Sequence, residues 1–188
     1  MTDSTRRRFL RRATTAAATA SLASLAGCSG LLAEESAQTT PVDYTLPEAT
    51  PSAEVRMGPE GSNRFDPLIV RVEEGGTVTW TNVSRNHSAT AYAPANDYPR
   101  RIPEEAEAWD TGVLLGSDKS ASHTFETPGV YDYYCTPHEP LGMVATVVVG
   151  DPDPADQPGL RPPSDERSGR AASELETLNA KVRSGLEK

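Results

Sequence analysis

Basic residues, aromatic residues and long hydrophobic runs are all scarce in this chain. Asp and Glu outnumber Lys and Arg by 27 to 18, which argues against nucleic acid as a partner, because phosphate binding needs clustered basic side chains. The apolar stretch at residues 13–26 is too short and too rich in Ala and Thr to cross about 30 Å of hydrocarbon. Only 6% of the residues are aromatic, but 16 prolines and 14 glycines are typical of short strands flanked by extended segments.

Residues 1–27 predict an export signal. Basic residues 6–11 precede a weakly apolar Ala/Thr/Ser/Leu run and then a small-residue cleavage site. Within residues 5–10 the pattern Thr-Arg-Arg-x-Phe-Leu is of the twin-arginine type. Because the charged residues of this segment are mostly arginines, we expect the mature chain to be more acidic than the full one.

One of only two cysteines lies directly after this segment. Residues 25–28, Leu-Ala-Gly-Cys, resemble the lipobox of secreted lipoproteins, in which the cysteine becomes the N-terminus and carries the lipid. Two or more acyl chains hold a protein stably on a membrane, so we expect Cys28 to anchor the chain on the extracytoplasmic face of the cell membrane. The alternative is an ordinary signal peptide cleaved nearby, which leaves Cys28 free or disulfide-bonded to Cys135.

Composition separates a tether from a folded domain. Residues 28–52 are rich in Ser, Ala, Glu, Thr and Pro, so we expect a flexible, disordered tether. Residues 53–150 alternate short runs of β-branched and aromatic residues with Gly- and Pro-containing turns, which predicts one all-β sandwich. Its strand-like runs include residues 68–72, 77–82, 130–134 and 144–149.

A Pro-rich linker and then a helix are predicted for residues 151–188. Apolar residues recur three or four positions apart within residues 165–187, and Ser173 and Glu176 have the spacing of a capping box. An isolated helix of this length is marginal in water. Three alternatives follow for this segment: packing on its own domain, binding a partner, or disorder.

The second cysteine belongs to a metal-ligand pattern. Cys135, His138 and Met143 follow one another as Cys-x2-His-x4-Met after the strand-like run 130–134, and His87 lies upstream. A thiolate and two imidazoles in a plane, with a weak axial thioether, suit both Cu(I) and Cu(II). One tight loop can supply three of these ligands while His87 arrives from a neighbouring strand, so we predict one copper site.

Other functions would use some of the same residues. A cysteine hydrolase would pair Cys135 with His87 or His138, but that pairing does not explain Met143. Multicopper oxidases and nitrite reductases need more ligating histidines than the three present, so we predict that the protein is not an enzyme. A copper carrier or storage protein outside the cytoplasm, with a more exposed site, stays open as the alternative. The third histidine, His123, is expected on the sheet surface.

The chain resembles the cupredoxins. Together with its acidity, lipobox and twin-arginine pattern, it most resembles the halocyanins, which are plastocyanin-like blue copper proteins of halophilic archaea. The resemblance covers about residues 65–150, including residues 78–82, 109–112, 129–135, His138 and residues 142–143. It implies a Greek-key β-sandwich that holds one type 1 copper ion, with His87, Cys135 and His138 as equatorial ligands and Met143 as axial ligand.

The resemblance also implies a membrane-anchored carrier of single electrons. Its partners would be redox proteins, including membrane-bound complexes, and we expect a monomer. His138 is the expected exit for the electron, because Pro137, Pro140 and Leu141 surround it with apolar surface that can form a docking patch.

Ser88 departs from the family pattern, which usually has Asn directly after the first histidine. There the Asn side chain ties the two ligand loops together. A serine hydroxyl makes a shorter tie, for which we expect Thr136 as the partner. The reduction potential cannot be carried over from the family, because hydrogen bonds around the ligands help to set it.

Overall fold

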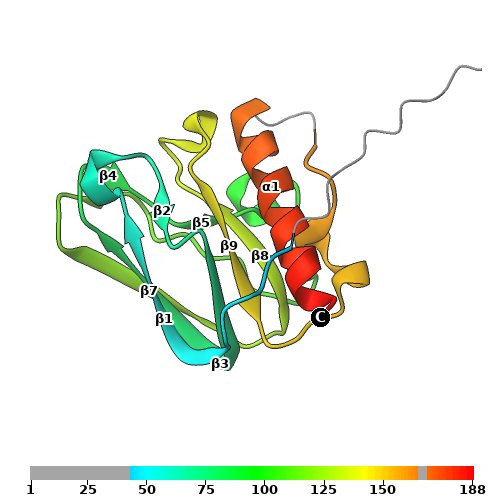
Figure 1. The fold of residues 1–188 in the computed structure, drawn as a ribbon. Helices are drawn as coiled ribbons and strands as arrows, with labels where there is room; N and C mark the ends of the chain where they lie inside the picture. The colour runs from blue at the N-terminus through cyan, green and yellow to red at the C-terminus, as the bar shows by residue number, and fades with distance from the viewer. Residues whose placement is uncertain (1–42, 165–168) are drawn as a thin grey trace, which may run out of the picture. The chain divides into compact units, whose positions relative to one another are not determined.

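The computed structural model describes residues 43–164 and 169–188 (Figure 1). The predicted signal segment, the predicted lipid attachment site Cys28 and tether residues 28–42 lie outside these described residues. Within these described residues, nine strands and one α-helix follow one another. They are β1 (Thr50–Met57), β2 (Phe65–Asp66), β3 (Ile69–Asn82), β4 (Asn86–His87), β5 (Thr90–Ala91), β6 (Leu114–Leu115), β7 (Lys119–Phe125), β8 (Gly129–Tyr134), β9 (Val144–Val149) and α1 (Gly169–Leu186).

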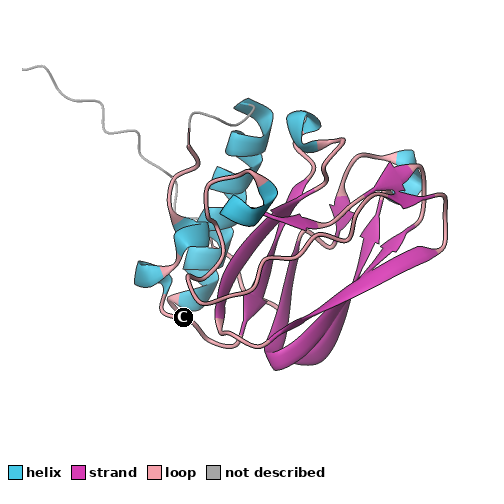
Figure 2. Ribbon diagram, turned by 180° about the vertical axis from the view of Figure 1, so that it is seen from behind, coloured by secondary structure: helices cyan, strands magenta, loops and turns pink. Residues whose placement is uncertain are grey.

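The strands form the predicted all-β sandwich (Figure 2). Strand β3 links its two halves. The first part of β3 pairs in parallel with β9, whereas its second part pairs in parallel with β1 and antiparallel with β7. β8 continues the sheet beyond β9, and β5 pairs with β8. The two-residue strands β4 and β6 form a separate small sheet.

Aromatic side chains fill the core between the two halves of the sandwich. Trp80 on β3 is fully buried, and its ring stacks on Trp109 at 5.6 Å between ring centroids. Tyr133 on β8 meets Trp80 edge to face at 5.5 Å. Because side chains alternate across a strand, Tyr131, Tyr133 and Cys135 all point into this core. The cysteine is therefore placed at the end of a buried row.

Helix α1 packs on the outer face of the same sheet, which decides among the three alternatives for the C-terminal segment. Its apolar stripe, Ala171, Leu175, Leu178 and Val182, is buried. The stripe meets the outward-facing side chains of β8 and β9 in a second hydrophobic cluster. Both faces of these two strands are thus covered, which explains why β9 is an almost unbroken apolar run.

The predicted end of the flexible tether at residue 52 is wrong, and part of the Pro-rich linker is packed against the fold. Residues 43–52 do not belong to a flexible tether: Leu46 is 7% exposed, the Tyr44 backbone NH donates to Ser184 Oγ at 3.2 Å, and β1 begins at Thr50. Leu160 in the Pro-rich linker is 2% exposed. Sequence composition missed these contacts because they depend on a helix more than a hundred residues away or on the sheet beneath it.

A buried ion pair joins Asp132 on β8 to Arg101 in the loop between β5 and β6. Arg101 Nε lies 2.8 Å from Asp132 Oδ2, and the two side chains are 3% and 0% exposed. The Arg101 guanidinium also donates to the carbonyl oxygens of Gly159 and Arg161. Thr146 Oγ1 donates to Asp132 Oδ1 at 2.6 Å. These hydrogen bonds give the buried Arg101 guanidinium and the buried Asp132 carboxylate the partners that burial requires.

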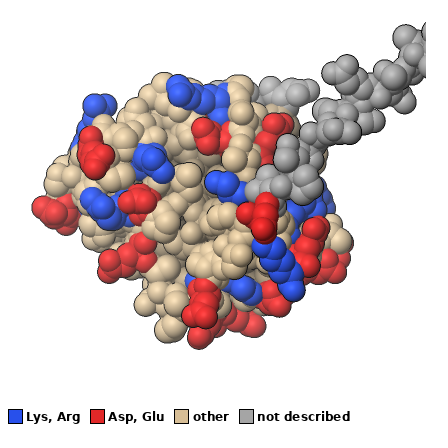
Figure 3. All heavy atoms as spheres, viewed as in Figure 1, with Lys and Arg blue, Asp and Glu red and all other residues tan. Residues whose placement is uncertain are grey.

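The surface is mixed in charge. On the face shown in Figure 3, acidic and basic side chains are interspersed among uncharged ones. That face has no clustered basic surface of the kind that phosphate binding needs. Among the helices that the structure describes, none is long and apolar enough to cross a membrane.

Candidate metal centre

His87 reaches the site from β4, which is held in place by a side chain at the end of β3. Asn82 Nδ2 donates to the carbonyl oxygens of Arg85 at 2.8 Å and Leu114 at 2.9 Å. These bonds draw β4 and β6 together, so that His87 pairs with Leu114. The His87 side chain is fully buried. Asn82 was not singled out from the sequence, because an asparagine at a strand end usually only starts a turn.

The other predicted ligands come from one loop between β8 and β9. The Cys135 carbonyl accepts from the backbone NH groups of His138 and Glu139, at 2.9 and 2.8 Å, and the Cys135 NH donates to the Met143 carbonyl at 3.0 Å. A short 3-10 turn, Glu139–Leu141, ends at Gly142, whose φ of 84° is left-handed and therefore favours glycine. The loop closes on itself and brings Met143 back beside Cys135.

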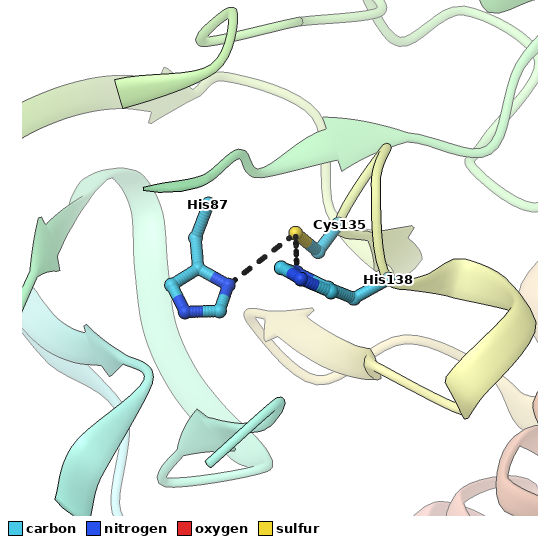
Figure 4. A group of neighbouring side chains, drawn as sticks. All are labelled: His87, Cys135 and His138. Atoms are coloured by element: carbon cyan, nitrogen blue, oxygen red, sulfur yellow. Dashed lines mark hydrogen bonds between the residues drawn. The ribbon is translucent and has the colours of Figure 1, made fainter. Parts of the chain in front are cut away.

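The structure brings one sulfur and two ring nitrogens together (Figure 4). Cys135 Sγ lies 3.6 Å from His87 Nδ1 and 3.3 Å from His138 Nδ1. Two donors bound at 120° to one ion, with metal–sulfur and metal–nitrogen bonds of about 2.3 and 2.0 Å, would lie about 3.7 Å apart. The observed separations are close to that value. This donor set therefore fits a three-coordinate plane around one ion.

Met143 lies in the same region of the core. Its side chain is fully buried and belongs to the hydrophobic cluster that contains Cys135. Its backbone NH donates to the His138 carbonyl at 3.2 Å. The fourth predicted ligand is thus tied by backbone hydrogen bonds to two of the other three.

Burial sets the protonation of the three donors. It lowers the pKa of His87 to about 4, with the nearby positive charges of His138 and Arg85 as smaller causes. Burial and Arg85 also lower the pKa of His138. Both imidazoles are therefore neutral near pH 7 and can offer a lone pair to a metal. Burial raises the pKa of the Cys135 thiol, so metal binding must displace its proton.

Ser88 and Thr136 connect the two ligand loops. The Ser88 backbone NH points at Cys135 Sγ at 3.4 Å. Ser88 Oγ accepts from the Thr136 backbone NH at 2.8 Å and donates to Thr136 Oγ1 at 3.0 Å. The Ser88 hydroxyl thus joins the two loops by hydrogen bonds to Thr136, which is the partner expected from the sequence.

Gly58 lies against the far side of the His87 ring. It has a φ of 75°, and a Cβ there would lie 2.5 Å from Ser84 Oγ and closer still to His87 Nε2. Any other residue would push the imidazole out of its place. Sequence reasoning missed Gly58, because only the fold brings the end of β1 to this histidine; the glycine directly after a strand was the only signal.

His123 is not part of the cluster. Among the described residues, the group that can hold a metal consists of His87, Cys135 and His138. His123 lies on β7, half-exposed, with its ring stacked on Trp109 at 5.1 Å between centroids.

Exposed apolar side chains lie on the segments that carry His138 or pair with His87, and the His138 ring is half-exposed. Leu141 is 50% exposed, beside the exposed Pro137 and Pro140 of the predicted docking patch. Val113 and Leu115, on either side of the residue that pairs with His87, are 42% and 67% exposed. These three are the exposed large hydrophobic side chains among the described residues, and all lie on segments that carry or pair with a predicted ligand. Val113 and Leu115 were not expected, because β6 was not predicted as a strand.

Comparisons with known proteins place the same segment in one group. Residues 53–150 match the family model of copper binding proteins of the plastocyanin/azurin family. A pseudoazurin of Methylorubrum extorquens is 34% identical over 110 residues, which cover 57% of this chain and 68% of that protein. A chloroplastic plastocyanin of Tetradesmus obliquus is 29% identical over 147 residues, covering 72% of this chain and 88% of that protein.

Solved structures of similar proteins agree in fold. The crystal structure of pseudoazurin from Methylobacterium extorquens aligns with a TM-score of 0.54 and 28% identity, over 70% of this chain and 98% of that one. Native pseudoazurin from Hyphomicrobium denitrificans gives the same values. The likeness therefore extends over more of the chain than the family model matches.

Proposed function

The chain belongs to the plastocyanin/azurin family of copper-binding proteins, and from that membership we propose that it carries single electrons on one type 1 copper ion. His87, Cys135 and His138 would hold the ion in a plane, with Met143 on the axis. Copper, when bound, supplies a one-electron couple between Cu(I) and Cu(II). The observation that carries the proposal is the cluster of one buried sulfur and two neutral imidazole nitrogens.

The surroundings of the donors favour electron transfer over the handing on of copper. His87 and Cys135 are fully buried, and the two loops that hold them are tied together through Ser88. Donors held in this way move little when the charge of the ion changes. A copper carrier or storage protein has to release its ion, and its site would usually be more exposed.

A redox cycle of the copper-loaded full chain tests this proposal. With Cu(II) we expect an intense visible absorption from thiolate-to-copper charge transfer and a narrow copper hyperfine splitting in the EPR spectrum. Reduction should remove both, and reoxidation should restore both without loss of copper. Weak colour, or release of the ion on reduction, would instead favour the carrier or storage function.

The apolar surface around His138 supports a docking patch, which we propose consists of Pro137, Pro140 and Leu141 with Val113 and Leu115 beside them. The imidazole of His138 is the donor group that reaches this surface, because His87 and Cys135 are buried. A partner that packs on the patch would bring its own redox centre close to the His138 ring. Apolar contact of this kind tolerates high salt, whereas long-range attraction between charges is screened.

Leu141→Glu is expected to slow electron self-exchange between two copies of the chain by at least about tenfold, because about 1.4 kcal/mol of added repulsion is a tenfold change. Self-exchange can be measured from the broadening of NMR lines in mixtures of the two oxidation states. Thr124→Glu, which adds the same charge to the exposed face of β7, is the matched control and should leave the rate near that of the wild type. Equal rates for Leu141→Glu and the wild type would exclude Leu141 from the patch.

The location of the protein is a separate proposal, and the N-terminal motifs support it. We propose that the chain is exported through the twin-arginine pattern and anchored by lipid on Cys28 at the extracytoplasmic face of the cell membrane, as a halocyanin-like monomer. Its electron donor and acceptor would then be redox proteins at that face, including membrane-bound complexes. Mass spectrometry of the native N-terminal peptide should find lipid on Cys28, and an unmodified Cys28 would contradict the anchor.

A further inference from the structure

Three hydroxyl groups lie within hydrogen-bond distance of one another, close to the predicted metal ligands in the chain and in space. The oxygen atoms of Ser88, Thr90 and Thr136 form a triangle with sides of 3.0, 3.2 and 3.2 Å. Ser88 directly follows His87 and Thr136 directly follows Cys135, so two corners of the triangle belong to the ligand loops. Ser88 is 0% and Thr90 2% exposed. Since Ser88 and Thr90 are shielded from water, the hydrogen bonds of these two hydroxyls must be made with each other or with nearby protein groups, whereas Thr136 is exposed.

Asp110 gives the triangle a direction. Its Oδ1 lies 2.8 Å from Thr90 Oγ1, and because an ionised carboxylate can only accept, Thr90 must donate to it. The single hydroxyl hydrogen of Thr90 is then used, so toward Ser88 and Thr136 this hydroxyl can only accept. Ser88 donates to Thr136, which leaves Thr136 as the donor to Thr90. The hydrogen bonds therefore run in one sense, from Ser88 through Thr136 and Thr90 to Asp110.

Asp110 is itself held by the loop that leads into β6. Its Oδ1 also accepts from the backbone NH of Gly112 at 2.9 Å. The next residue, Thr111, accepts on Oγ1 from the backbone NH of Ala89 at 2.9 Å, and the Thr111 backbone NH donates to the Ala89 carbonyl at 3.1 Å. Two consecutive residues of this loop are thus fastened to the strand that follows His87.

We propose that Thr90 and Asp110 are positioning residues of the metal centre, which orient the Ser88 and Thr136 hydroxyls and thereby set the reduction potential of the site. A hydroxyl rotates about its own C–O bond, so Ser88 alone does not define the geometry of the tie. Thr90, held as an acceptor by its bond to Asp110, draws the Thr136 hydroxyl hydrogen toward itself and leaves Thr136 Oγ1 to accept from Ser88. The redox part of this inference rests on the proposed electron-carrier function.

The hydrogen bonds between Ser88 and Thr136 act on the metal centre through the Ser88 backbone NH, which approaches the sulfur of Cys135. This NH points at Cys135 Sγ at 3.4 Å, and a hydrogen bond to sulfur draws electron density away from the metal. Less donation from the thiolate favours Cu(I) over Cu(II). If the Ser88 loop moves, this bond lengthens and the reduction potential falls.

Thr90→Val removes the hydroxyl and keeps the shape of the side chain. We expect a lower reduction potential, a loss of copper affinity of about tenfold or more, and faster hydrogen exchange at the Ser88 and Thr136 amides. Thr90→Ser keeps the hydroxyl, so it should restore all three properties to near wild-type values. The potential is measured by spectroscopic titration of the copper-loaded full chain, and the exchange by NMR.

Thr146→Val separates positioning from stability. Thr146 is 1% exposed, and its hydroxyl also donates to a carboxylate, that of Asp132, but it lies on β9 outside the ligand loops. This variant should lose stability and keep the wild-type reduction potential. The proposal fails if Thr90→Val retains the wild-type potential and amide exchange, or if Thr146→Val shifts the potential as much as Thr90→Val does.

Asp110 gives a second, independent pair of variants. In Asp110→Asn the amide oxygen can accept both hydrogen bonds, from Thr90 and Gly112, whereas Asp110→Ala loses both. We expect Asp110→Ala to behave like Thr90→Val, and Asp110→Asn to keep slow exchange at the Thr136 amide. Wild-type exchange in Asp110→Ala would overturn the role of Asp110.

The exchange measurements are also made on the metal-free full chain, so that the tie is tested without copper. If the wild type lacks the intense absorption, the electron-carrier function fails, while the amide exchange still decides whether Thr90 and Asp110 orient the hydroxyls. If the absorption is present and the exchange is unaffected by Thr90→Val, the function stands and the positioning role is wrong.

Discussion

Replacement of Cys135 by serine is expected to abolish the intense visible absorption of the copper-loaded protein. The absorption needs a thiolate donor, and a serine hydroxyl keeps its proton near pH 7. The oxygen of serine is also a hard donor, which suits Cu(I) poorly. Removal of a residue that only hydrogen-bonds to a metal ligand typically lowers metal affinity by roughly 10–100-fold. Removal of the ligand itself should lower copper affinity by more than that. The visible spectrum, the EPR spectrum and a copper titration measure these changes.

Cys28→Ser is the matched control, because Cys28 is the other cysteine of the chain. This variant should show the wild-type absorption and the wild-type affinity. Serine is close to cysteine in size, so Cys135→Ser should fold, and circular dichroism of the metal-free chains can establish that. An intense absorption that survives in Cys135→Ser, or that disappears in Cys28→Ser, would contradict the assignment of Cys135 as the thiolate ligand.

Replacement of Arg101 by methionine is expected to lower the free energy of unfolding by about 3–5 kcal/mol, because it leaves a buried charge without its partner. Asp132 is 0% exposed and lies 2.8 Å from Arg101 Nε. The carbonyl oxygens of Gly159 and Arg161 lose donors in the same substitution. Chemical denaturation of the metal-free and copper-loaded chains measures the loss.

Two further variants show whether the buried charge is the cause. Arg100→Met removes the neighbouring arginine, which lies 3.5 Å from Glu104 in an ion pair nearer the surface, and should cost less than about 1 kcal/mol. Replacing both Arg101 and Asp132 by apolar residues of similar size should recover much of the lost stability. If Arg101→Met costs no more than Arg100→Met, the buried pair does not hold this side of the sheet.

The same substitution should loosen the C-terminal helix. Arg101 also contacts Asn179 Oδ1 on α1 at 3.4 Å, so one guanidinium connects β8, the linker and the helix. Hydrogen exchange in α1 should accelerate in Arg101→Met more than in Arg100→Met. Asp132 lies three residues before Cys135 on the chain, which makes this network part of the support behind the ligand loop.

Local spacing was enough to predict the ligand loop. Cys135, His138 and Met143 lie within nine consecutive residues, and the backbone hydrogen bonds that close the loop join residues of that same segment. The strand before the loop was readable for a similar reason, because β-branched and aromatic residues favour a pleated, half-buried strand. His87 was placed by chemistry: an upstream imidazole completes the donor set.

Several parts of the site had no local signal. Gly58, Asn82, Thr90 and Asp110 are ordinary turn or strand residues in the sequence, and each acquires its role from a residue on another segment. Ser84 and His87 meet Gly58 only because the end of β1 lies beside β4. Asp110 meets Thr90 across a bridge between segments twenty residues apart. Patterns read within one segment do not contain such pairings.

The amino-acid sequence by itself determined the sandwich class and the candidate ligand set, because strand periodicity and ligand spacing are properties of neighbouring residues. Only the tertiary structure decided that α1 covers β8 and β9, that residues 43–52 belong to the folded domain, and that Val113 and Leu115 lie beside the site. Each of these depends on burying apolar surface against a segment distant in the chain. That free energy is available only once both segments are in place.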